Sequence, residues 1–192
     1  KTSALNALKL FLLPEVNFKS CESKFGFSSG GTVYSGLESF NYYFPSPTSF
    51  IILEATNVQG DFCIVLHQNP KEELGYSRIA VPESYDVIRH FFWETKAQEN
   101  QGMGRHPIGF SLSDVQKSLL NLKGITLIDQ ESIRTALYTR VSPTKPETRY
   151  CLMPLVQQPK APMMRSIKAL LQLSFDIKGA DKKNLPLAIA NI

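Results

Sequence analysis

The sequence lacks long hydrophobic runs and has few cysteines. No apolar stretch approaches the roughly 18 residues that a membrane-spanning helix needs. The first residues, KTSALNALKLFLLPEV, lack the basic start, long apolar stretch and cleavage site of a secretory signal. Cys21, Cys63 and Cys151 are odd in number, with spacings of 42 and 88, which excludes a CxxC metal site and a disulfide framework. We therefore expect a protein with no membrane partner in a reducing compartment.

Residue patterns that signal catalysis or cofactor binding are also missing. His67, His90 and His106 have no HExxH or HxH spacing, so we expect structural or surface roles for them. FSSGGTVYSG does not have the order of a phosphate loop or a nucleophile elbow, and GMGRHPIG does not fit a dinucleotide fingerprint. The adjacent acids Glu72 and Glu73 lie in a charged stretch and are expected to be solvated. From the sequence we therefore expect a protein that is not an enzyme and that has no catalytic residue, metal ligand or cofactor.

Charge is unevenly distributed along the chain. The net charge is +4, but residues 1–116 hold 9 basic and 12 acidic residues, whereas residues 117–192 hold 12 and 5. A basic second part can face nucleic acid or an acidic partner, although a solvated surface is the commoner meaning. Lys182-Lys183 is the only basic pair in this part. The pattern does not identify which basic residues would contact RNA.

Strand patterns are more frequent than helix patterns. Residues 49–58 and 61–67, separated by Gln59-Gly60, predict two adjacent strands joined by a tight turn. Apolar residues at every second position predict a long strand over 167–178. Two short helices are expected over 3–13 and 113–122. Shorter strands are expected over 32–34, 39–44, 87–93, 108–112, 125–128, 136–141 and 149–156.

About ten short strands separated by turn residues are typical of a β-sandwich or barrel. We therefore expect an all-β fold, an eight-stranded antiparallel jelly-roll sandwich with one or two short helices. The 192 residues suit a single domain, with 1–16 as an N-terminal arm and 180–192 as a C-terminal tail. Its core is expected to contain Ile51, Leu53, Phe62, Ile64, Leu66, Leu152, Leu171, Leu173 and Phe175.

Two stretches resemble the coat proteins of picorna-like viruses. SFNYYFPSPTSFIILEATNVQGDFCIVLHQNP has their order of an aromatic strand, a proline-bearing turn, an alternating strand, a glycine turn and an apolar strand. TRYCLMPLVQQPKAPMMRSIKALLQLSFDIKG is similar to their last two strands. The resemblance is closest to the plant group of comoviruses, nepoviruses and cheraviruses, the Secoviridae. It covers about a third of the chain and concerns strand order rather than signature residues.

The resemblance implies a structural capsid subunit of an icosahedral virus. Such a subunit would assemble with related jelly-roll subunits in the host cytoplasm and enclose an RNA genome in the virion. Release from a polyprotein would explain a chain that starts at Lys1, and the terminal segments would tie neighbouring subunits together. RNA contact, if made, would be electrostatic and sensitive to salt.

Two other classes of protein remain open. In a monomeric carbohydrate- or peptide-binding sandwich, an exposed Trp93 or Tyr43 would stack on the ligand. An RNA-binding movement or accessory protein would bind single strands with a steep salt dependence. The cluster Phe91-Phe92-Trp93, flanked by Arg89 and Lys96, allows base stacking, but burial in a core or a subunit interface is the commoner use of such a cluster.

Overall fold

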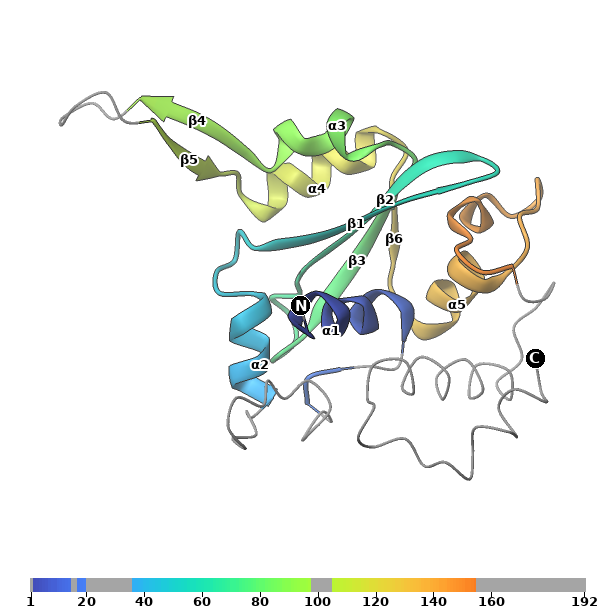
Figure 1. Ribbon diagram of the computed structural model, residues 1–192, viewed down its shortest axis with the longest axis horizontal. Helices are drawn as coiled ribbons and strands as arrows, with labels where there is room; N and C mark the ends of the chain where they lie inside the picture. Colours follow the sequence, from blue (N-terminus) through green and yellow to red (C-terminus); the bar gives the residue numbers. More distant parts are fainter. Residues whose placement is uncertain (1, 15–16, 20–35, 98–104, 155–192) are drawn as a thin grey trace.

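The computed structural model describes residues 2–14, 17–19, 36–97 and 105–154 (Figure 1). In chain order the elements are α1 (Thr2–Leu12), α2 (Gly36–Tyr43), β1 (Phe50–Asn57), β2 (Gly60–Gln68), β3 (Tyr76–Val81), α3 (Tyr85–Ile88), the 3-10 helix η1 (Arg89–Phe91), β4 (Trp93–Ala97), β5 (Arg105–Gly109), α4 (Leu112–Asn121), β6 (Ile125–Leu127), α5 (Gln130–Tyr138) and the 3-10 helix η2 (Pro146–Tyr150).

A four-stranded antiparallel sheet is the centre of the fold. Its strand order is β1-β2-β3-β6. Strands β1 and β2 pair from Phe50 opposite His67 to Asn57 opposite Gly60, which confirms the predicted hairpin. The tight turn needs its glycine, because Gly60 has a φ of 100°, which other residues rarely adopt. The Asn57 side chain donates hydrogen bonds to the carbonyls of Arg149 and Cys151 and so ties this turn to η2.

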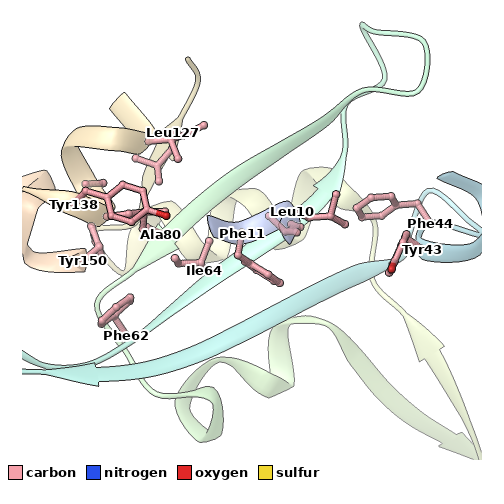
Figure 2. Close-up of a cluster of buried hydrophobic side chains, with 14 of the residues drawn as sticks. Leu10, Phe11, Tyr43, Phe44, Phe62, Ile64, Ala80, Leu127, Tyr138 and Tyr150 are labelled. Carbon is pink, nitrogen blue, oxygen red and sulfur yellow. The ribbon is translucent and has the colours of Figure 1, made fainter. Parts of the chain in front are cut away.

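Helices cover both faces of this sheet. Phe62, Ile64 and Leu66 of β2 lie on one face, in a cluster with side chains of α1, α2 and α5 (Figure 2). Cys63 and Val65 lie on the other face, in a cluster with side chains of α3 and α4. Burial of successive residues is expected for a strand covered on both sides. The predicted burial of Phe62, Ile64 and Leu66 is confirmed, but the prediction missed the buried residues between them.

The expectation of antiparallel β-structure is confirmed, but several predicted strands are helices. Residues 39–44 belong mostly to α2, in which Ser39 and Tyr43 are buried four residues apart. Residues 87–93 form α3 and η1 before β4 begins. Residues 136–141 begin inside α5, whose start is fixed by a capping box between Asp129 and Ser132. The spacing of buried residues in α2 and the capping box of α5 therefore favour helix over the strand propensity of these two segments.

Other predicted elements lie where the sequence placed them. The helices expected at 3–13 and 113–122 correspond to α1 and α4, and the strand at 125–128 corresponds to β6. The strand expected at 108–112 overlaps only the end of β5. Residues 149–154 are not a strand, because η2 reaches Tyr150. Ile51, Leu53 and Leu152 are partly buried against the core, as expected.

Strands 32–34 and 167–178, the core residues Leu171, Leu173 and Phe175, and the C-terminal tail lie outside the described residues. The described residues form one four-stranded sheet between helices and a separate two-stranded sheet, β4–β5. Two facing four-stranded sheets are not what this part of the chain forms.

Helix α1 packs onto the chain's own sheet, although the sequence predicted an arm in this region. Leu10 and Phe11 are almost completely buried (Figure 2), and so is Leu13. The carbonyls near the end of α1 are also bound, since Arg78 donates to the Leu10 carbonyl and Tyr138 donates to the Leu12 carbonyl. Because the last carbonyls of a helix have no partners within it, these contacts fix the end of α1 in place.

Candidate interaction surface

The hairpin β4–β5 projects from the body of the molecule (Figure 1). Its strands pair only with each other among the described residues, from Trp93 opposite Gly109 to Ala97 opposite Arg105. An isolated two-stranded hairpin is marginally stable in water. A projecting hairpin of this kind gains stability when a partner covers it. We call residues 93–97 and 105–109 the hairpin arm.

The base of the hairpin arm is firmly attached to the body. Phe92 is buried, and its ring lies 5.1 Å from the ring of Phe50 in β1. The Phe110 N–H donates to the Phe92 carbonyl at 3.0 Å and closes the base of the arm. Buried residues of α3 and α4, including Ile88 and Val115, belong to the same cluster as Phe92. The arm therefore leaves the body from a fixed position.

Exposed apolar side chains lie next to this base. Trp93, the first residue of β4, is 46% exposed. Tyr85 and Val87 of α3 are also exposed large apolar residues. Helix α3 is held at its first N–H, which Tyr85 donates to the Glu54 carboxylate at 2.9 Å. Aromatic residues that are exposed and rigidly placed are typical of protein interfaces.

The histidines lie on separate elements. His67 is buried at the end of β2, where its Nδ1 lies 2.7 Å from the Gln68 carbonyl and its Nε2 lies 3.4 Å from the Gln116 amide nitrogen. Since a carbonyl only accepts, Nδ1 carries the proton. Burial lowers the pKa of His67. His90 is exposed on η1, and His106 is in β5 opposite Lys96. The buried His67 and the exposed His90 therefore do not share one site.

Two of the cysteines are buried free thiols. These are Cys63, on the face of the sheet that α3 and α4 cover, and Cys151, just after η2. Burial raises the pKa of Cys63 to about 12, with further contributions from Glu54 and Asp61. Such a thiol is a poor nucleophile because the thiolate is the reactive form. Cys21 lies outside the described residues.

Other residues considered from the sequence are also scattered. Tyr43 is buried against Phe18, with ring centroids 6.0 Å apart, so it cannot stack on a ligand, whereas Trp93 is accessible. Glu72 and Glu73 are exposed, as expected. Gly30-Gly31, Gly102 and Lys182-Lys183 lie outside the described residues.

Within the ranges that the structure describes, no three His, Cys, Asp or Glu side chains are grouped to hold a metal ion. None of the helices in those ranges has the length and apolar character to cross a membrane. The sequence indicates the aromatic cluster that contains Trp93 but not the hairpin arm. The local signal for the arm is the alternating segment WETKA, of which only Trp93 falls within the predicted strand 87–93.

Comparison of the chain with protein-family models, curated proteins and solved structures found no match.

Proposed function

We propose that this chain is a structural protein that works by associating with other protein subunits, and that the hairpin arm makes the contact. The observation that carries the proposal is the hairpin arm itself, which projects from the body with Trp93 exposed at its base. A partner that covers the arm would bury Trp93 and satisfy the open edges of a two-stranded sheet. Among the described side chains, His67 and His90 lie on separate elements, and the buried Cys63 thiol is a poor nucleophile.

The more specific form of the proposal is a coat subunit of a picorna-like virus. The β1–β2 hairpin supports this form, because it matches the strand pair in the resembling stretch. Helix α2 counts against this form, because the resemblance implies an aromatic strand there. The helical cover on both faces of the sheet also counts against it. Negative-stain microscopy of material from the native source tests this form. Closed shells would support it, and a monomer at every salt concentration would contradict it.

Sedimentation of the full chain tests the general proposal. The variant Trp93→Ser removes the exposed indole at the base of the arm. Leu120→Ser is its matched control, because Leu120 on α4 is also 46% exposed. Apolar anchors at interfaces cost more than 2 kcal/mol when removed, which corresponds to about a 30-fold weaker association. We expect that loss for Trp93→Ser and none for Leu120→Ser, whereas equal association of both variants would refute the role of the arm.

The exposure of Trp93 also favours a second candidate, a monomeric module that binds a carbohydrate through this indole. In that case the wild-type chain sediments as a monomer at every concentration, and an oligosaccharide protects Trp93 from quenching. The two candidates are therefore separated by the same sedimentation series.

A further inference from the structure

A cavity of about 450 Å³ lies on the face of the sheet that α1 and α5 cover. Its walls come from the segment after α1, from the turn between β2 and β3, from β3, and from the start of α5. Its volume falls within the range of small-molecule sites in proteins. We call it the Arg78 pocket, after the buried cation that lines it. It is separate from the hairpin arm and does not depend on the proposed function.

Arg78 is held rigidly at this pocket. Only 5% of the surface of Arg78 is exposed. Its Nε and Nη2 donate to the Leu10 carbonyl at 3.1 and 2.6 Å, and Nη2 also donates to the Tyr76 hydroxyl at 3.1 Å. The guanidinium carbon lies 4.8 Å from the centre of the Tyr76 ring. The guanidinium plane is therefore fixed by three hydrogen bonds and a cation–π contact.

Part of this arrangement is explained by the fold alone. The Leu10 carbonyl is near the C-terminal end of α1, where a cation is favourable. That capping role uses Nε and Nη2 but leaves Nη1 without an acceptor among the described residues. No carboxylate of the described part lies within the 4.0 Å of an ion pair with Arg78. Because the described part of the chain gives the largely buried Arg78 no carboxylate partner, an anion at Nη1 would be stabilising.

The other walls restrict which anion fits. Lys19 adds a second cation, whereas Glu72 and Asp129 bring negative charge to the lining. The Ser132 N–H donates to Asp129 at 2.7 Å and helps to keep the pKa of that carboxyl below its ordinary value, so it is ionised. Two carboxylates near the site disfavour a dianion such as a phosphate monoester. Apolar wall residues, which include Leu74 and Ile133, favour a ligand with an apolar body.

We propose that the Arg78 pocket binds organic monocarboxylates, with the carboxylate on Nη1 of Arg78 and the apolar body against Leu74 and Ile133. Arginine is well suited to this role because its planar fork matches a carboxylate. The same chemistry is present in a free carboxylic acid and in the C-terminal carboxylate of a peptide. The experiment therefore includes a probe for each source.

Calorimetric titration of the full chain with four probes tests the ligand class. Hexanoate represents a free acid, and N-acetyl-leucine represents a peptide C-terminus. Hexanamide lacks the charge, and hexyl phosphate carries a second one. We expect one or both carboxylates to bind with a Kd of about 1 mM or tighter, and the amide and the phosphate to bind at least about tenfold more weakly. Equal binding of hexanoate and hexanamide, or no binding of either carboxylate, would overturn the proposal.

Exposed residues at the pocket provide variants that should fold normally. Ile128 lines the pocket and is 84% exposed, so Ile128→Glu and Ile128→Lys change the local charge without disturbing the core. We expect the first to weaken carboxylate binding by about 2- to 5-fold and the second to strengthen it by a similar factor, as exposed charges do. Asp129→Asn keeps a good helix N-cap and should also strengthen binding.

Arg78→Lys tests the anchor itself. It keeps the positive charge but loses the planar fork, and we expect at least about tenfold weaker binding in a chain whose circular dichroism is native. Lys117→Glu, on exposed α4 at the opposite face of the sheet, is the control and should bind as the wild type does. If Ile128→Glu, Ile128→Lys and Asp129→Asn all leave the Kd unchanged, the carboxylate binds elsewhere and the proposal is refuted.

Discussion

Replacing Leu10 by alanine should strongly destabilise the isolated chain. Leu10 is completely buried on α1, within the cluster that includes Phe11 and Ile64 (Figure 2). Removing the buried methyl groups and leaving a cavity costs about 2–5 kcal/mol. The hydrogen bonds from Arg78 go to the Leu10 backbone carbonyl, so they survive the substitution and the loss is one of packing. In urea unfolding followed by circular dichroism, the midpoint should fall by about 1–2 M.

The control is Leu37→Ala on α2, where the side chain is 55% exposed. We expect its stability to stay within about 0.5 kcal/mol of the wild type. If α1 were instead an arm that binds neighbouring subunits, Leu10→Ala would leave the unfolding of the monomer unchanged and weaken only its assembly. An unchanged midpoint for Leu10→Ala would therefore refute the packing of α1 on its own sheet.

Three further predictions concern single groups. Lys123 follows α4 with a φ of 63°, and the bonds from Lys123 N–H to the Leu120 carbonyl and from Gly124 N–H to the Leu119 carbonyl form a Schellman motif. A lysine is strained at this φ and a glycine is not, so Lys123→Gly should stabilise the chain by about 0.5–1 kcal/mol in urea unfolding. A destabilised Lys123→Gly variant would contradict backbone strain at this position. Burial holds the pKa of His67 below its ordinary 6.5 in the folded chain, so on acidification the unfolded chain binds a proton at this imidazole first. The free energy of unfolding should therefore fall as the pH drops below about 6.5. His67→Asn should flatten the dependence of this free energy on pH between about pH 7 and pH 5. An equally steep profile in His67→Asn would assign the acid sensitivity to other groups. The Cys63 thiol, with its pKa near 12, should resist iodoacetamide at about pH 8 in the folded chain and react in urea, as read by peptide mass mapping; rapid labelling of Cys63 in the folded chain would contradict its burial.

The sequence was most informative where local signals agreed. The β1–β2 hairpin was predictable because two apolar runs flank a glycine turn, and α4 was predictable because Ser113-Asp114 and Gly124 mark its ends, although the N-cap in the structure is Ser111. It was least informative where aromatic residues were dense. The segment SFNYYF has high strand propensity, yet most of it belongs to α2, and the ring of Phe40 packs against the ring of Phe44 just after the helix, with centroids 5.4 Å apart. Tertiary packing decided that segment.

The cover on both faces of the sheet was readable in principle. The run FCIVLH has six consecutive residues without an exposed position, and a half-exposed strand would have polar residues between the apolar ones. The Arg78 pocket was not readable, since an arginine in the strand YSRIAV does not reveal that its guanidinium would meet the end of α1. The projection of the hairpin arm could not be deduced from the sequence either, because it depends on how far the packed sheet and its helices extend beside the two strands.

Hydrogen exchange measured across a series of protein concentrations tests most directly whether the hairpin arm is where this protein meets its partners. If it is, backbone amides of β4 and β5 become more protected as the concentration rises, while those of β2 and β3, inside the sheet, do not change. Arm amides that exchange at the same rate from the most dilute to the most concentrated sample would contradict the account.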